Sequence, residues 1–418
     1  DVLDTWFSSW LWPFSVFNWH EDPSNKDLQY YYPTNDLVTG HDIIFFWVAR
    51  MIIAGYHFTG QKPFKNVYFT GMVRDKKGRK MSKSLGNSPD ALGLIDQFGA
   101  DGVRVGMLLS APAGNDLPFD DSLCLQGRNF ANKLWNAFRL LKGWEVDNTI
   151  STPQSSTDAI EWFESRMNQS LQSLGQQFDQ FRISEALMTS YKLIWDDFCS
   201  WYLEMIKPKF GEAIDASTHK QTILFFDAIV RMIHPFMPFI SEEIWQNIEE
   251  RNGASIVDAK WPEKATFNES VLKRMDFNME LISSIRQVRT EQQISPKESL
   301  SLYVAKNDGL VLEELVLKMA NIDKITALDA EVQNTRTIVV DKHEFFIPLS
   351  TNIDEESERQ RITKELDYAK GFLKSVDKKL ENERFVSSAP ESVVSAERKK
   401  KQDAEIKIKL LEKQLQDL

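Results

Sequence analysis

Two apolar stripes near the end of the chain constrain its fold more than any other feature. In the first stripe, apolar residues recur at alternating steps of four and three positions: Ile362, Leu366, Ala369, Leu373, Val376 and Leu380. The second stripe has the same spacing: Ala404, Ile408, Leu411, Leu415 and Leu418. This spacing places all members of a stripe on one side of a helix. Two such stripes, joined by a proline-containing loop over residues 382–392, predict an antiparallel helical hairpin within residues 351–418.

The segment of residues 148–275 predicts an all-α bundle. One helical stripe precedes Pro208, which ends it: Leu187, Tyr191, Ile194, Phe198, Trp201 and Met205. Residues 223–233 predict a second buried helix, and Ser241 is a candidate N-cap for a third. Three apolar helices in succession are typical of a bundle.

Residues 1–147 instead alternate short apolar runs with glycine turns. We expect strands near residues 38–39 and 67–70, a helix over 43–55, and a helix capped by Ser88 and ended by Gly99. Strands and helices in alternation indicate α/β structure. Residues 276–350 predict a small α/β module, with strands at 301–304 and 337–340 and a helix at 310–319.

The composition fits a large globular protein of about three domains. The net charge of the 418 residues is −11, but residues 354–418 hold fifteen basic and fifteen acidic residues, so the predicted hairpin is neutral and can approach a polyanion. The two cysteines have no close partner in sequence, which favours a cytoplasmic location. The apolar run 43–49 ends at Arg50, well short of the roughly 20 residues of a membrane span.

The stretch GRKMSKSLGN (residues 78–87) places Lys80 and Lys83 between two glycines. Flexible cations on a hinged loop suit the binding of phosphate groups. The alternative is a basic turn that only faces water, which is what charge runs usually do.

Several strings together resemble the valyl-tRNA synthetase family within the class I aminoacyl-tRNA synthetases. They are DVLDTWFSS (1–9), YYPTNDLVTGHDIIFFWVARM (31–51), KMSKS (80–84), RNFANKLWNA (128–137) and HPFMPFISEEIWQ (234–246). The resemblance implies that Lys83 contacts ATP and that Lys80 stabilises the departing pyrophosphate. Further implied roles are ATP binding by Met81, Ser82, Ser84, Gly40 and Asp42, and an amino-acid side-chain pocket walled by Trp6 and Trp47.

The same resemblance assigns the domains. Residues 1–147 would be half of a Rossmann-type catalytic domain, 148–275 an anticodon-binding bundle, 276–350 a linker module and 351–418 a tRNA-binding arm. None of the six histidines stands in a HIGH-type motif, and no editing domain is seen, so we expect a C-terminal fragment of a monomeric enzyme with exposed apolar surface on the half-sheet. Candidate tRNA phosphate contacts are Arg286, Arg289, Arg398, Lys399, Lys400 and Lys401.

The expected parent activity is ATP-dependent activation of valine, with magnesium accompanying the ATP, followed by transfer of valine to tRNA. No tightly bound cofactor, zinc or other metal is expected, and no membrane partner. The fragment alone should be inactive but bind tRNA weakly. Two alternatives remain open: a non-catalytic tRNA-binding module, and isoleucine specificity within the same class.

Overall fold

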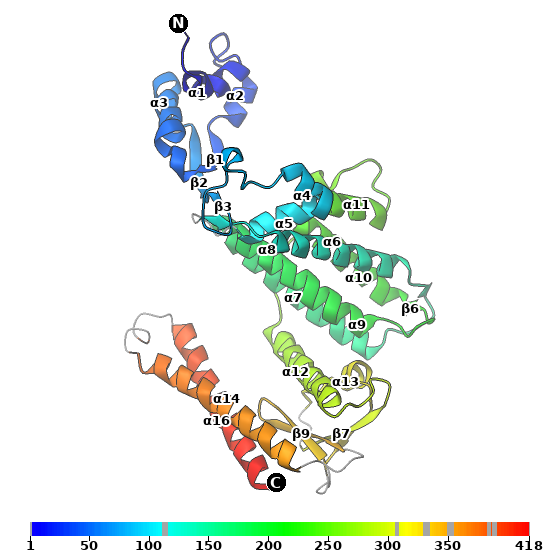
Figure 1. Ribbon diagram of the computed structural model, residues 1–418. Helices are drawn as coiled ribbons and strands as arrows, with labels where there is room; N and C mark the ends of the chain where they lie inside the picture. Colours follow the sequence, from blue (N-terminus) through cyan, green and yellow to red (C-terminus); the bar gives the residue numbers. More distant parts are fainter. Residues whose placement is uncertain are drawn as a thin grey trace. The chain divides into compact units, whose positions relative to one another are not determined.

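The computed structural model describes residues 2–110, 116–305, 309–328, 335–348, 355–382, 386 and 391–417. These residues form two compact units (Figure 1). Unit 1 contains residues 1–151, 166–203 and 208–267, and unit 2 contains 152–165, 204–207 and 268–418. The chain is therefore multidomain and mainly helical, and each unit is described below by itself.

Unit 1 begins with a small α/β layer. Strands β1 (Thr34–Gly40) and β2 (Phe64–Thr70) pair in parallel, with Gly40 opposite Thr70 at their carboxyl ends. The crossover between them is one continuous helical run formed by η1 (His41–Ile43), η2 (Ile44–Val48) and α3 (Ala49–Thr59). Helices α1 (Thr5–Val16) and α2 (Lys26–Tyr31) precede the strands. The strand–helix–strand alternation predicted for this region is thus confirmed.

A second parallel pair follows, formed by β3 (Val73–Arg74) and β4 (Leu117–Pro118). Between them lie η3 (Lys83–Leu85), α4 (Ala91–Phe98) and α5 (Ala100–Ser110). Helix α4 ends at Gly99 as predicted, with φ at +77°. Its N-cap, however, is Asp90 rather than Ser88, because the Asp90 carboxylate accepts the Gly93 N–H at 3.0 Å.

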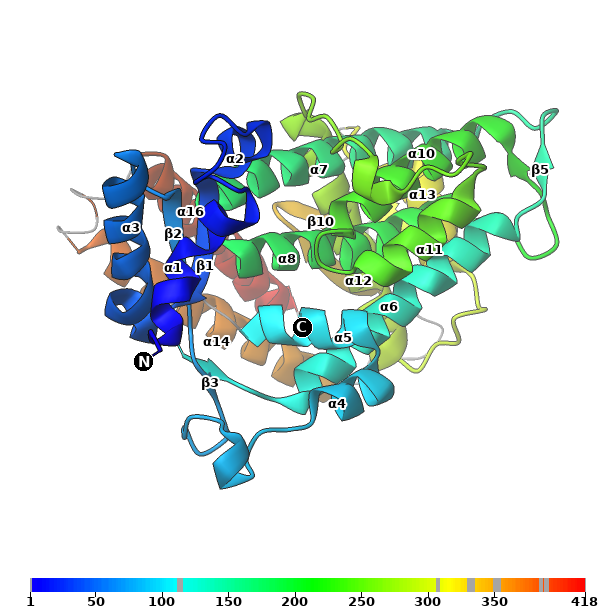
Figure 2. The same ribbon diagram turned by 90° about the horizontal axis from the view of Figure 1, so that it is seen from above.

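The remainder of unit 1 is a helical bundle, whose long helices are seen lengthwise in Figure 2. Its elements are α6 (Asp121–Lys142), α7 (Gln154–Asp179) from residue 166, α8 (Ile183–Lys192), η4 (Leu193–Tyr202), α10 (Ala216–Ile233), α11 (Pro238–Ile248) and η5 (Ile256–Asp258). A short pair, β5 (Val146–Asp147) and β6 (Ile214–Asp215), closes one end. Phe198 is fully buried and stacks on Tyr202 and Phe226, so the stripe predicted before Pro208 is core.

Unit 2 contains an α/β module. Helix α9 (Leu203–Ile206) lies mostly in this unit, followed by α12 (Glu269–Glu291), β7 (Leu300–Val304), α13 (Glu313–Ala320), β8 (Ile322–Ala327), β9 (Thr335–Val340) and β10 (His343–Pro348). The four strands form one sheet in the order β8-β7-β10-β9. The boundary predicted between residues 275 and 276 is wrong, because it falls inside the continuous helix α12, which packs on α13 and β9.

The C-terminal hairpin consists of α14 (Glu355–Leu380) and α16 (Glu391–Asp417). Its buried seam contains the predicted residues Ile362, Leu366, Ala369, Ile408 and Leu411. The ion pairs between the two helices run in opposite directions along the chain. Lys370 of α14 pairs with Glu412 of α16 at 2.7 Å, whereas the later residue Asp377 of α14 pairs with the earlier residue Lys401 of α16 at 2.7 Å. The helices are therefore antiparallel, as predicted; most of their connection (383–385 and 387–390) lies outside the described residues.

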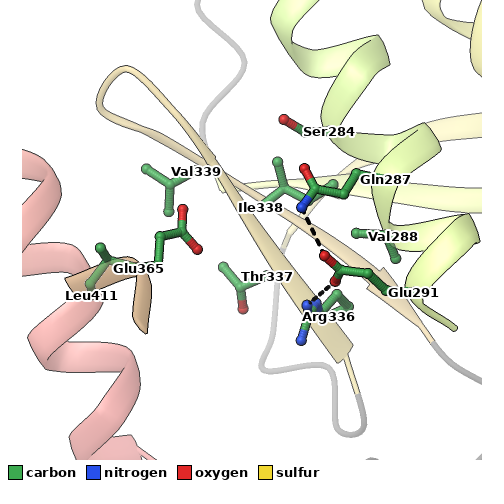
Figure 3. Close-up of a pocket in the computed structure, with 10 residues that line it drawn as sticks. All are labelled: Ser284, Gln287, Val288, Glu291, Arg336, Thr337, Ile338, Val339, Glu365 and Leu411. Atoms are coloured by element: carbon green, nitrogen blue, oxygen red, sulfur yellow. Dashed lines mark hydrogen bonds and ion pairs between the residues drawn. The ribbon is translucent and has the colours of Figure 1, made fainter. Parts of the chain in front are cut away.

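The base of this hairpin faces the module across a small cavity (Figure 3). Arg336 of β9 is almost fully buried there and pairs with Glu291 of α12 at 2.5 Å. Glu365 and Leu411 of the hairpin line the opposite wall. A charged pair thus fixes the edge strand β9 against α12 next to the arm.

Large apolar side chains are exposed on the α/β layer of unit 1. Phe45 is 80% exposed, Phe46 66% and Trp12 69%. The helical run His41–Thr59 is also long and apolar enough to cross a membrane, although it contains Arg50 and length and composition alone are weak evidence of a span. Arg50, which ends the apolar run of residues 43–49, lies with its guanidinium carbon 4.3 Å from the centre of the Trp6 ring. The predicted apolar surface is confirmed.

Candidate functional site

The carboxyl ends of β1 and β2 bring glycine and carboxylate together. Gly40 ends β1, and Asp42 lies in the helical turn that follows. A Cβ atom added to Gly40 would lie 2.7 Å from Asp42 Oδ1, so a larger residue at position 40 would displace this carboxylate. Ligands of α/β sheets usually bind at the carboxyl ends of the strands, where this carboxylate is exposed.

The KMSKS loop reaches the same edge. Lys80 Nζ lies 3.5 Å from Asp42 Oδ2, and both side chains are partly open to solvent. The contact joins residues that are 38 positions apart in sequence. The structure therefore brings Lys80, Gly40 and Asp42 together, as the resemblance implied, and an incoming phosphate group would compete with Asp42 for the ammonium.

Polar contacts that the sequence did not reveal hold the loop in shape. Asn87 Nδ2 donates to Asp75 Oδ2 at 3.1 Å and to the Lys80 carbonyl at 3.2 Å, while its Oδ1 accepts the Ser82 N–H at 2.9 Å. Hydrogen bonds from Asn87 and then Arg79 lower the pKa of Asp75 well below its usual range. Asp75 therefore remains a carboxylate at neutral pH and keeps its contacts. In the sequence, the only indication of these contacts is that the polar residues Asp75 and Asn87 stand before and after the motif.

Arg79, another cation of the loop, forms an ion pair within the loop itself. Its guanidinium lies 2.7 Å from Asp75 Oδ2. Gly78, with φ at +76°, forms the turn between these two residues. Arg74 is occupied in the same way by Asp116, at 2.5 Å. Lys80, in contrast, has its described ion pair at the strand ends, with Asp42.

The other residues of the motif have separate surroundings. Met81 packs against a buried cluster of Phe98, Phe119 and Cys124, against which Val103 and Met107 of α5 also pack. Ser82 Oγ and Ser84 Oγ lie 3.0 Å apart, and Ser82 Oγ accepts the Leu85 N–H. The side chain of Lys83 lies outside the described residues, so its ATP contact stays a prediction.

Three family models match the chain in succession. Residues 1–120 match "tRNA synthetases class I (I, L, M and V)", residues 161–304 match "Anticodon-binding domain of tRNA ligase", and residues 354–418 match "Valyl tRNA synthetase tRNA binding arm". The chain belongs to the class I tRNA synthetases. The anticodon-domain match extends past the predicted boundary at 275 and ends with β7.

Curated relatives agree over the whole chain. The valine–tRNA ligase of Christiangramia forsetii is 52% identical, covering 100% of this chain and 48% of that protein. The valine–tRNA ligases of Parabacteroides distasonis (51%, covering 99% and 48%) and Geobacillus kaustophilus (41%, covering 96% and 47%) are also similar. The chain spans about half the length of the curated relatives it matches.

The two tryptophans expected in the amino-acid pocket lie on helices that pack together. Trp6 belongs to α1 and contacts Phe7, Trp10 and Arg50. Trp47 lies in η2 and is half-buried. Helices α1 and η2 contact one another, and the role of the two tryptophans in an amino-acid pocket stays a prediction.

Two of the candidate tRNA contacts have structural roles in α12. The Arg289 side chain is 6% exposed and donates to the carbonyls of Ala320 and Asn321 at the end of α13. Its assignment as a phosphate contact is therefore wrong. Arg286 donates twice to the Met319 carbonyl but remains exposed. Both arginines satisfy carbonyls at the negative end of a helix, where cations are favourable.

The basic run on the hairpin divides into two pairs. Lys400 pairs with Glu397 at 2.7 Å, and Lys401 pairs with Asp377 across the hairpin. Arg398 and Lys399 are exposed, and within the described part of the chain no ion pair engages them. We conclude that Lys400 and Lys401 stabilise the arm itself, which leaves Arg398 and Lys399 as the candidates of this run.

Proposed function

We propose that this chain is the C-terminal part of a valine–tRNA ligase, which activates valine with MgATP and transfers the valyl group to tRNA. The observation that carries the proposal is the 3.5 Å approach of Lys80 to Asp42 at the carboxyl ends of β1 and β2. This contact supports the proposal, since a lysine suits the phosphates and a carboxylate can accept hydrogen bonds from ribose hydroxyl groups. The identity with valine–tRNA ligases over the whole chain supports valine as the amino acid.

In this proposal each group has one task. Gly40 allows the nucleotide to approach the backbone, and Asp42 accepts hydrogen bonds from its ribose. Lys80 moves from Asp42 to the phosphates and stabilises the charge that develops as pyrophosphate leaves. Lys83, Met81, Ser82 and Ser84 complete the loop that closes over ATP. Residues 1–147 supply half of the Rossmann-type site, so activation requires the other half.

Split-enzyme complementation tests the activity. We expect this chain alone to show only background valine-dependent exchange of pyrophosphate into ATP. Co-expressed with the N-terminal half of the Christiangramia forsetii enzyme, it should restore exchange, and Lys80→Ala should reduce that rate about 10²–10³-fold, as for loss of one group that stabilises a transition state. Lys76→Ala, which removes a neighbouring exposed lysine, is the matched control.

The outcomes separate the candidates. Exchange that depends on isoleucine instead of valine would indicate the other specificity. A complemented complex that binds tRNA yet shows no exchange would favour a binding module. Substantial exchange by the chain alone would contradict the assignment of half a site.

We also propose that the arm contacts tRNA mainly through the outer face of α14, opposite the apolar seam. Lys364, Lys374 and Lys378 lie on this face, and so do Tyr368, which is 77% exposed, and Gly371, which has no neighbour within 4 Å of an added Cβ. Phosphate groups attract the lysines, and a base can stack on an exposed tyrosine. Arg398 and Lys399 lie on the other helix, α16, and are a second candidate contact on that helix.

This assignment predicts a change in the salt dependence of tRNA binding. We expect Lys374→Ala with Lys378→Ala to weaken binding and to lower the slope of log K against log salt by about 1 per lysine. Filter binding across a salt series measures the slope. Lys400→Ala is the matched control, since its ammonium already pairs with Glu397. Equal slopes for the double variant and the parent chain would contradict the assignment of this face.

Two further expectations stay proposals. The free and buried Cys124 and Cys199 are compatible with a reducing cytoplasm. A monomeric parent enzyme is expected from the family, with tRNA, ATP and valine as its partners.

A further inference from the structure

The first part of the KMSKS loop, residues 73–81, folds back on itself as a short two-sided turn. One side is β3, and the other contains Lys80, which forms an antiparallel bridge with Arg74. The Met81 N–H donates to the Val73 carbonyl at 3.1 Å. Figure 2 shows this segment between β3 and α4. The backbone position of Lys80 is therefore set by β3.

One carboxylate binds β3 and the residue before it. Asp116 stands directly before β4, the parallel partner of β3. Its Oδ1 accepts the Met72 N–H at 3.1 Å, and its Oδ2 accepts the Arg74 Nε–H at 2.5 Å. Hydrogen bonds from Arg74 and then Met72 lower the pKa of Asp116, so this side chain is a carboxylate at neutral pH.

Arg74 extends this contact to the turn that leads to Lys80. Its Nε–H is directed to Asp116, while its Nη1 donates to the Gly78 carbonyl at 3.0 Å. Gly78 lies two residues before Lys80. Because a guanidinium is planar and its N–H groups have fixed directions, it fixes the angle between its two acceptors. Arg74 thus joins Asp116 to the segment that carries Lys80.

Asp116 also reaches the opposite side of the candidate site. The Sδ atom of Met72, the residue whose N–H it binds, lies 3.8 Å from a Cβ atom added to Gly40. Gly40 and Asp42 form the side that is proposed to bind the ribose, and Lys80 belongs to the side proposed for the phosphates. The bonds of this one carboxylate therefore connect both sides of the proposed nucleotide site.

We propose that Asp116 and Arg74 are positioning residues, which hold Lys80 at the distance from Gly40 and Asp42 that amino-acid activation requires. They act through Lys80 and not on the substrate. This inference rests on the proposed function, because it takes Lys80 as the group that stabilises the departing pyrophosphate. A small displacement of such a group lowers the rate steeply: about 1 Å can cost about 10²-fold.

Valine-dependent pyrophosphate exchange by the complemented enzyme tests the pair. Asp116→Asn keeps the size of the side chain but removes the negative charge beside Arg74. We expect the rate at saturating ATP to fall about tenfold, less than a 1 Å displacement can cause. The KM for valine should change less than about twofold, because Lys80 is proposed to act in the transition state.

A double variant separates positioning from general damage. Lys80→Ala combined with Asp116→Asn should be no slower than Lys80→Ala alone, because a residue that acts through Lys80 has nothing left to position. If the losses of the two single variants multiply, the proposal is overturned. Arg74→Gln should lower the rate as Asp116→Asn does. Arg74→Lys keeps the charge without the fixed fork and should recover only part of the rate.

Asp120→Asn is the matched control, since it is the same substitution four residues further along the chain. Asp120 caps α6 by accepting the Ser122 N–H at 3.0 Å, and asparagine caps a helix about as well as aspartate. The rate of pyrophosphate exchange by this variant should therefore stay within about twofold of the parent rate. An equal loss in Asp120→Asn and Asp116→Asn would contradict a special role of Asp116.

Hydrogen exchange of the complete chain gives a readout that needs no activity. Asp116→Asn and Arg74→Gln should each speed exchange of the Met81 amide by about threefold or more relative to Asp120→Asn, because the turn opens locally. An unchanged Met81 amide in both variants overturns the proposal. If the complemented parent enzyme shows no pyrophosphate exchange, the proposed function fails, and the Met81 amide alone decides whether the pair holds the turn. Circular dichroism checks that each variant is folded.

Discussion

Replacing Arg289 with alanine is expected to destabilise unit 2 by about 3 kcal/mol or more, because each shielded acceptor left without a donor costs about 1–3 kcal/mol. The guanidinium donates to four carbonyls, those of Ser295, Glu298, Ala320 and Asn321. It thereby joins α12 to the loop before β7 and to the end of α13. Burial lowers the pKa of Arg289, but an arginine remains charged at neutral pH, so these bonds stay charge-assisted.

Native-state hydrogen exchange of the α12 and α13 amides would measure the loss in this unit. Arg286→Ala is the comparison variant: its side chain is exposed, so water can replace part of its hydrogen bonding to the Met319 carbonyl, and its loss should cost less than the loss of Arg289. A stable Arg289→Ala variant with weakened tRNA binding would instead support the phosphate contact that the burial of this side chain argues against.

Replacing Gly127 with alanine is expected to destabilise the α5–α6 pair. Alanine would improve helix propensity by about 1 kcal/mol. The new Cβ, however, would lie 2.5 Å from the Gly102 carbonyl oxygen and 2.9 Å from Val105 Cβ, which real structures do not accommodate without a shift. Overpacking of this kind costs about 1–3 kcal/mol and more against backbone, so a net loss of about 2 kcal/mol is expected.

A glycine elsewhere in unit 1 provides the control for this substitution. Gly175 also lies within a helix, α7, but has no atom within 4 Å of an added Cβ. Gly175→Ala should therefore stabilise its helix by up to about 1 kcal/mol. Hydrogen exchange of the α5, α6 and α7 amides compares the two variants. Stabilisation by both would show that α5 and α6 can move apart without cost.

The elements that were predicted well are those whose signal is periodic. The stripes before Pro208 and in the C-terminal hairpin are apolar at every third or fourth residue, and the structure buries both. Strand β8 was missed because Asp323 and Lys324 interrupt its apolar residues, and strand β10 was missed because its apolar run, residues 345–347, is only three residues long. Such strands are fixed by their neighbours in the sheet, which a local pattern does not contain.

The candidate site divides in the same way. The family motifs that contain Lys80 and Asp42 predicted that both residues belong to one ATP site. The local sequence did not predict that their side chains lie 3.5 Å apart. The role of Asn87 could not be predicted, since it depends on partners that only the folded chain brings near. Arg289 shows the opposite error: a helical arginine looks like a surface cation until burial is known, because the sequence does not say which face of α12 is covered.

The exposed aromatic residues of the α/β layer have a practical consequence for every measurement on this chain. Phe45, Phe46 and Trp12 form an exposed hydrophobic surface through which molecules of the protein can self-associate. Added salt weakens attraction to RNA but strengthens such adhesion when the anion is of the sulfate type. Titrations should therefore use chloride at low protein concentration, or self-association will distort the apparent electrostatic slope.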